Sequence, residues 1–174
     1  MSDEVMSGQA RGDATLAAIE QVYRRDLERF LRVAAALLGD RDAARDAVQE
    51  GFAHAVARRD TYSGRGPLEA WVWRVVVNRA RNYRRDRGAP TAPLERELVD
   101  VAATNGARET GALRAALAAL PERQRLVVFL HYFADLDYPT IAGALDIRQG
   151  TVAATLNAAR TNLRRALEQE VPQQ

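Results

Sequence analysis

The chain has 174 residues, of which 47% are hydrophobic, and its 25 basic residues, all arginine, nearly balance 23 acidic ones for a net charge of +2. Cysteine is absent, which excludes disulfides, cysteine-based zinc sites and thiol nucleophiles. The sequence shows neither a signal-peptide pattern nor an apolar run of membrane-spanning length, so we expect a cytoplasmic protein without membrane insertion.

The spacing of apolar residues predicts three helices in the first half of the chain, over 13–38, 40–59 and 67–87. Asp13 and Asp40 are candidate N-caps, and Gly39 is expected to end the first helix. Pro67 suits the first position of the third helix. Residues 1–12 are polar and are expected to fray.

The third of these helices, LEAWVWRVVVNRARNYRRDR, is the most unusual segment. Helical spacing predicts that one apolar set packs inward: Trp71, Val72, Val75, Val76 and Ala80. A polar stripe runs along another side: Arg74, Asn78, Arg81, Asn82 and Arg85. Charge, amides and aromatic rings together are what single-stranded nucleic acid binding uses. Two alternatives stay open. Trp71 and Trp73 can be core or domain-packing residues, and the nine arginines between residues 58 and 87 can form a solvated helix face.

A linker and a second helical domain are predicted for the rest of the chain. Residues 89–107 contain two prolines and little periodicity. Four further helices are expected, over 107–120, 121–133, 140–146 and 150–167. The last two and the tight turn between them resemble a helix-turn-helix, whose second helix usually enters the DNA major groove. The predicted fold is all-α, with two small helical domains, 13–88 and 108–170, joined by a flexible linker over 89–107.

The sequence contains no constellation that points to catalysis. It has neither a phosphate-binding GxxxxGK[ST] loop nor a GxGxxG dinucleotide motif. His54 and His131 are its two histidines, and His131 with nearby Asp135 and Asp137 makes a poor metal site. We therefore expect no enzyme activity, no metal, no cofactor and no small-molecule substrate.

Two parts of the chain resemble bacterial RNA polymerase sigma factors of the extracytoplasmic-function (ECF) class. DAARDAVQEGF, TYSGRGP and LEAWVWRVVVNRARNYRRDR resemble their first conserved domain, and ALPERQRLVVFLHYFADLDYPTIAGALDIRQGTVAATLNAARTNLRRAL resembles the second. The resemblance covers most of residues 20–168 in the family's order. It implies a protein that binds core RNA polymerase and promoter DNA and promotes melting, and it leaves open an anti-sigma partner. A polymerase-independent helix-turn-helix regulator is the alternative.

The resemblance assigns site residues in the first domain. The surface that docks on core polymerase would include Asp42, Asp46, Gln49 and Glu50. The loop and third helix would open the −10 promoter element and hold a flipped base, with Tyr62 as the loop aromatic and Asn78 as the pocket amide. The remaining DNA-facing candidates are His54, Arg79, Asn82 and Arg85.

The second domain departs from the family's pattern. Members commonly carry basic residues directly after GTV, whereas this chain has Ala153 and Thr155 there. Asparagine can read adenine, and alanine or threonine can touch thymine methyl groups. Thr151 is expected to cap the helix. The candidates for contact with the −35 element are Arg148, Gln149, Thr151, Ala153, Thr155, Asn157, Arg160 and Arg164.

Overall fold

The computed structural model describes residues 2–86 and 107–169, with side chains over 15–86 and 111–168. These described residues form helices and turns without a β-strand, which confirms the all-α prediction. The predicted linker lies almost entirely outside them. None of the described helices is long and apolar enough to cross a membrane.

The N-terminal unit consists of three helices and a short 3-10 turn: α1 (Ser2–Leu38), α2 (Arg41–Ala57), η1 (Arg59–Thr61) and α3 (Leu68–Asp86). The predicted start of the first helix at Asp13 is wrong, since α1 already begins at Ser2 and Asp13 lies within it. Gly39 ends α1 with a φ of 69°, as expected. Asp40 caps α2 by accepting a 2.6 Å hydrogen bond from the backbone N–H of Ala43.

Trp73 is the centre of the N-terminal core. Its side chain is 0% exposed and stacks on Phe30 at a centroid distance of 3.8 Å. Phe52 of α2 meets Phe30 edge-on at 4.9 Å. Trp71 and Val75, also expected to pack inward, are only half-buried, and Trp71 packs against the edge of the core. Helix α3 packs against α1 and α2 on one side and α6 on another, and this shifts its buried stripe.

The C-terminal unit consists of α4 (Ala107–Ala119), α5 (Glu122–Val128), a π-helical turn η2 (Phe129–Phe133), α6 (Tyr138–Leu145) and α7 (Gln149–Gln169). The helix predicted over 121–133 therefore changes pitch at its end. Asp137 caps α6 by accepting a 2.9 Å bond from the N–H of Thr140. Hydrogen bonds from the side chain and the backbone N–H of Thr140 hold the pKa of the Asp137 carboxyl below its usual value. Asp146 adopts a left-handed conformation with a φ of 55° and turns the chain into α7.

Helix α7 buries the predicted apolar face, because Val152, Leu156 and Ala159 are all 0% exposed. It lies across α5 and α6, so α6, the turn and α7 form the expected helix-turn-helix. The prediction that Thr151 is the N-cap is wrong, since α7 starts at Gln149. The carbonyl of Arg148 accepts the first helical bonds, from the N–H groups of Thr151 and Val152.

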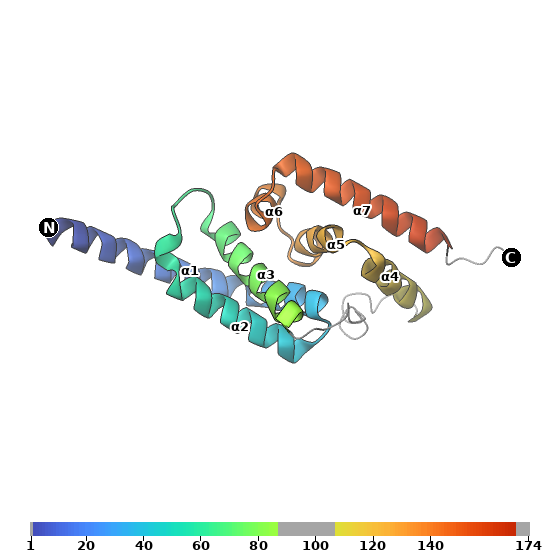
Figure 1. The fold of residues 1–174 in the computed structure, drawn as a ribbon, viewed down its shortest axis with the longest axis horizontal. Coiled ribbons are helices and arrows are strands. Elements are labelled where there is room, and N and C mark those ends of the chain that lie inside the picture. Colours follow the sequence, from blue (N-terminus) through green and yellow to red (C-terminus); the bar gives the residue numbers. More distant parts are fainter. Residues whose placement is uncertain (1, 87–106, 170–174) are drawn as a thin grey trace.

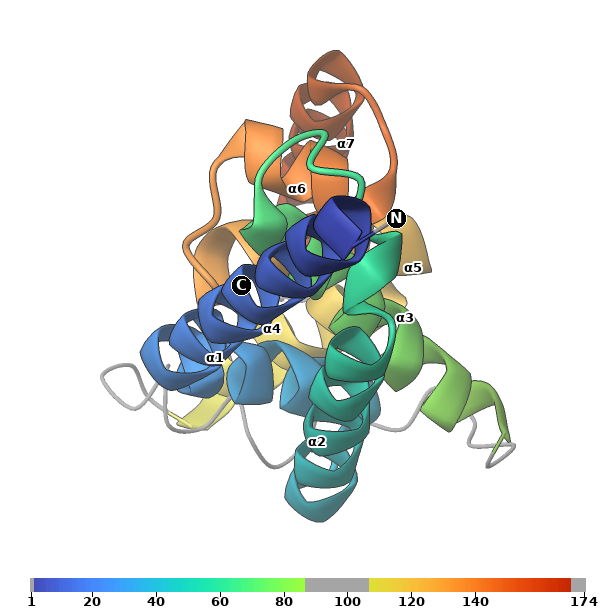
Figure 2. The ribbon, with the colours of Figure 1, turned by 90° about the vertical axis from the view of Figure 1, so that its left-hand side faces the viewer.

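The two units are packed against each other. Helix α3 lies between α1 and α2 on one side and α5 and α6 on the other (Figure 1). Buried residues of both units form one continuous hydrophobic cluster. Helices α2 and α7 lie at opposite edges of the molecule (Figure 2). The structure therefore adds an interface to the predicted pair of domains.

Candidate nucleic-acid interface

The exposed side of α3 and the loop before it carry the candidates for the −10 element. Asn78 is exposed, Asn82 is half-buried and Arg85 is exposed near the end of the helix. With 3.6 residues per turn, these three side chains and Trp71 share one side of α3. The structure therefore brings Asn78, Asn82 and Arg85 together on a single face.

Tyr62 is held beside this face by its own loop. Its hydroxyl donates a 2.6 Å hydrogen bond to the carbonyl of Gly66, and its ring lies 5.7 Å from that of Trp71. Gly64 and Gly66 have φ values of 74° and 84°, a conformation that favours glycine. The loop thus presents an aromatic pair at the start of α3, which is suited to stacking an unpaired base.

The other two −10 candidates, Arg79 and His54, lie apart from the ring pair of Tyr62 and Trp71. Arg79 turns towards α2, where its guanidinium pairs with the carboxylate of Glu50. His54 is exposed on the last turn of α2, just before η1. The structure therefore joins a DNA candidate, Arg79, to a polymerase candidate, Glu50, in one ion pair.

The candidates for polymerase docking form an exposed polar stripe on α2. Asp42, Asp46 and Gln49 recur at intervals of four and three residues, and all are exposed, as is Glu50. Asp46 accepts a 3.4 Å hydrogen bond from the hydroxyl of Tyr83 on α3. This stripe combines negative charge with accessibility, as a surface for a basic partner requires.

The candidates for the −35 element divide between two sides of α7. Ala153, Asn157, Arg160 and Arg164 recur at intervals of four, three and four residues, so they form one exposed stripe. Thr151 and Thr155 lie on another side, where the hydroxyl of Thr155 bonds back to the carbonyl of Thr151. Arg148 and Gln149 are exposed at the turn.

Arg160 has a partner that the sequence did not indicate. Its Nε donates a 2.9 Å hydrogen bond to the hydroxyl of Tyr132, and its guanidinium lies 5.9 Å from the centre of that ring. Tyr132 belongs to η2 and is 54% exposed. The change of pitch in η2 therefore places an aromatic ring beside the exposed stripe of α7.

The other histidine has a structural contact. The Nδ1 atom of His131 lies 3.1 Å from the carbonyl oxygen of Leu136, and nearby Asp137 is engaged as the cap of α6. Within the described part of the chain, no group of histidine, aspartate and glutamate side chains could hold a metal ion.

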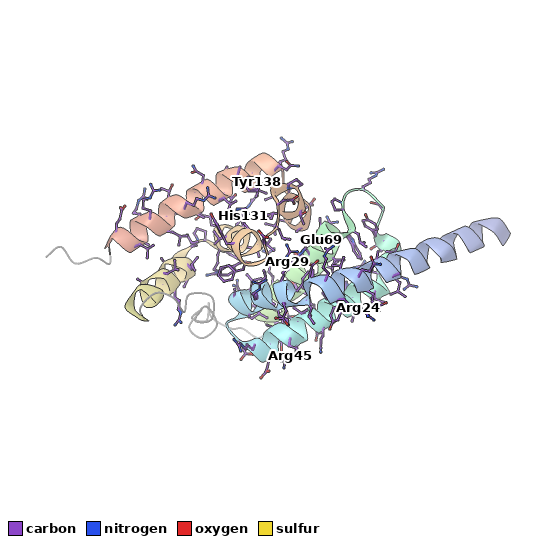
Figure 3. The ribbon with its side chains drawn as sticks, turned by 180° about the vertical axis from the view of Figure 1, so that it is seen from behind. Arg24, Arg29, Arg45, Glu69, His131 and Tyr138 are labelled. Atoms are coloured by element: carbon purple, nitrogen blue, oxygen red, sulfur yellow. The ribbon has the colours of Figure 1, made fainter. Side chains whose placement is uncertain are left out.

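The structure contains a charged network at the junction of the two units that the sequence did not predict. Asp26 is 2% exposed and accepts hydrogen bonds from Arg25 and Arg29. Burial disfavours the charged form of Asp26, yet these two arginines outweigh it and lower its pKa. Glu69 joins through Arg25 at 2.6 Å. Figure 3 shows Arg29 and Glu69 on the side of the N-terminal unit that faces the C-terminal one. A signal existed, because Asp26 occupies an inward position between the buried Val22 and Phe30.

Comparison with known proteins identifies the family of both units. The family models for Sigma-70 region 2 and Sigma-70, region 4, match residues 22–89 and 110–169. The ECF RNA polymerase sigma factor SigM of Mycobacterium tuberculosis is 30% identical over 94% of this chain and 83% of its own length. The RNA polymerase sigma-E factor of Streptomyces coelicolor is 30% identical over 85% of each chain.

Solved structures share the fold. The structure of CnrH in complex with the cytosolic domain of CnrY matches with a TM-score of 0.69 at 20% identity, over 94% of this chain and 96% of that one. The sigma factor RpoE, in complex with the anti-sigma factor NepR from Bartonella quintana, matches with a TM-score of 0.56 at 20% identity, over 98% and 100% of the two chains. With two region models in order and relatives matched over most of their length, the chain belongs to the ECF RNA polymerase sigma factors.

Proposed function

We propose that this sigma factor divides promoter recognition between its two units. As a member of its family, the chain binds core RNA polymerase and directs it to promoter DNA at the start of transcription. In the proposal, residues 13–88 hold the polymerase and open the −10 element, and residues 108–170 bind the −35 element. The observation that carries it is the grouping of Tyr62, Asn78 and Asn82 around one exposed side of α3.

A flipped base would be held between the loop and this side of α3. Extruding a base from the duplex costs a few kcal/mol, which stacking and edge hydrogen bonds must offset. The ring of Tyr62 beside Trp71 offers the stacking surface, and the Asn78 amide offers a donor and an acceptor. Arg85 would contact backbone phosphates, which position DNA without reading its sequence. The action proposed here is binding and strand separation in the cytoplasm, with no catalysis by the chain itself.

On α2, the exposed stripe of Asp42, Asp46, Gln49 and Glu50 is the proposed docking surface for core polymerase. An anti-sigma partner is a further proposal. It is supported by the two solved structures of the same fold, since RpoE is in complex with the anti-sigma factor NepR and CnrH with the cytosolic domain of CnrY.

Comigration with core polymerase separates this proposal from a polymerase-independent regulator. We expect the chain and core polymerase to elute together from a size-exclusion column, and Asp42→Arg with Asp46→Arg to weaken that complex. Reversing two charges on an accessible stripe opposes docking on a basic partner, because like charges across an interface are repulsive. A chain that elutes separately from core polymerase, as a dimer bound to DNA, would favour the regulator.

On α7, we expect Asn157→Ala and Arg160→Ala each to weaken binding to the upstream element about tenfold, within the roughly 1–3 kcal/mol of a good base contact. The measurement is the affinity of the polymerase complex for a promoter recovered by run-off transcription. Arg165→Ala is the matched control, because Arg165 is exposed on another side of α7. Equal affinities and unchanged footprints in all three variants would place −35 binding elsewhere.

A further inference from the structure

Glu122, the first residue of α5, joins the two units through a pair of arginines on α3. One carboxylate oxygen accepts a 2.8 Å hydrogen bond from Nε of Arg81, and the other accepts a 3.0 Å bond from an Nη atom of Arg84. Burial disfavours ionisation of Glu122, but the arginines outweigh it and lower its pKa. The carboxylate is therefore charged at neutral pH, and each of its oxygens engages one guanidinium.

Several contacts seat the C-terminal unit on this side of α3. Arg29 of α1 donates hydrogen bonds to the backbone carbonyls of Ala134 and Asp135. Arg74 shares one side of α3 with Arg81 and Arg84, and its guanidinium lies 3.8 Å from the carboxylate of Asp146. The helices α3 and α6 approach so closely that a Cβ atom at Gly143 would lie 2.9 Å from the Cβ of Ala70. The closed arrangement thus places two carboxylates of the C-terminal unit on the arginines of α3: Glu122 on Arg81 and Arg84, and Asp146 on Arg74.

The arginine stripe of Arg74, Arg81 and Arg84 borders the proposed −10 face. Arg81 lies three residues after Asn78 and four before Arg85, so it neighbours both on the surface of α3. A strand held on Asn78 and Asn82 would bring its phosphates within reach of the adjacent arginines. A carboxylate with one oxygen on each guanidinium offers the charge and acceptor pattern that a phosphate offers, and arginine recognises both groups in this way.

We propose that Arg81 and Arg84 form a binding site for the DNA backbone beside the −10 face, and that Glu122 occupies this site while the two units are closed. The inference rests on the proposed role of α3 in DNA binding. It makes the C-terminal unit an internal competitor of DNA. Opening of the interface releases the two arginines from Glu122, and closing pairs them with its carboxylate again.

The test measures binding of the full chain, without polymerase, to a short fluorescein-labelled DNA duplex of arbitrary sequence at low salt. We expect Glu122→Gln to tighten binding about fivefold, since two partly exposed ion pairs amount to a few-fold in a binding constant. The matched control is Glu20→Gln, which removes the same charge and frees Arg24 on α1 outside the proposed site. That control should change the affinity less than about twofold, the size expected for one exposed pair.

The salt dependence identifies the site. In the Glu122→Gln background, the further change of Arg81 and Arg84 to glutamine should remove the gain and lower the slope of log affinity against log salt by about 2, one for each lost phosphate contact. In a chain with Glu122 intact, the same two changes should alter the slope far less. A structural role for the arginines would not produce this difference.

Gly143→Ala opens the interface by a different route. The added methyl group would clash with Ala70, while alanine favours the α6 helix itself. We expect a folded variant, judged by circular dichroism, with the same gain in affinity. The proposal is overturned if Glu122→Gln gains no more than Glu20→Gln, if the gain survives loss of both arginines, or if folded Gly143→Ala binds like wild type.

Failure of this inference can be told from failure of the proposed function. Tyr62 and Asn78 test DNA opening in the polymerase complex and do not touch Glu122. If the Tyr62 and Asn78 variants lose DNA opening while Glu122→Gln has no effect, only the proposal that Glu122 competes with DNA is refuted. Full opening in their variants would remove the proposed −10 face, whatever Glu122→Gln does.

Discussion

Trp73→Ala is expected to lower the free energy of unfolding by about 3–5 kcal/mol, the usual range for truncating a buried tryptophan to alanine. The side chain is fully buried, stacks on Phe30 and lies where α1, α2 and α3 meet. Small domains are stable by only about 5–15 kcal/mol, so the change would remove much of the total. Urea denaturation followed by far-UV circular dichroism measures it.

Two controls make this prediction specific. Trp73→Phe keeps an aromatic ring on Phe30 and removes an indole N–H that has no hydrogen-bond partner among the described residues. Its loss of stability should therefore be well under half that of alanine. Trp71→Ala truncates the same residue type at a half-buried position and should lose about 1 kcal/mol. Equal losses at Trp71 and Trp73 would contradict the assignment of Trp73 as the core residue.

Tyr62→Ala and Asn78→Ala are expected to reduce open-complex formation about tenfold or more while leaving affinity for core polymerase within about twofold. Stacking of one base on an aromatic ring contributes about 1–3 kcal/mol, and about 1.4 kcal/mol corresponds to a factor of ten. The readout is the fraction of heparin-resistant complexes formed on a promoter by core polymerase with each variant.

Tyr62→Phe separates stacking from support of the loop. It keeps the ring beside Trp71 and removes the hydroxyl that bonds to the carbonyl of Gly66. If stacking is the main contribution, this variant should retain most of the opening activity. Gln21→Ala, an exposed amide on α1, is the control for Asn78. Opening at the wild-type level by both alanine variants would refute the roles assigned to Tyr62 and Asn78.

Much of the fold is predictable from the sequence because apolar spacing and caps act locally. Asp40 and Gly39 mark the junction of α1 and α2, and Val152, Leu156 and Ala159 mark the buried face of α7. The buried side of α3 is harder to predict from the sequence, because this helix packs against helices of both units. Its apolar residues therefore cover a wide arc, and spacing alone does not distinguish Trp71 from Trp73.

The contacts between the units depend on pairs far apart in the sequence. Nothing near Glu122 indicates that its partners are Arg81 and Arg84, and Arg79 belongs to the same arginine-rich segment yet pairs with Glu50. Helical spacing predicts which residues share a side, but the partner of each side is set by how whole helices pack. The sequence thus predicts the candidate DNA face, but it does not predict that Glu122 of the other unit pairs with the arginines beside it.

The most direct test of the central claim is run-off transcription by core RNA polymerase from a library of genomic fragments, with and without the chain. We predict discrete transcripts that require the chain and whose upstream sequences share two separated blocks, one for each unit. The Tyr62→Ala, Asn78→Ala double variant should abolish them. Transcription by core polymerase that is the same with and without the chain would contradict the account.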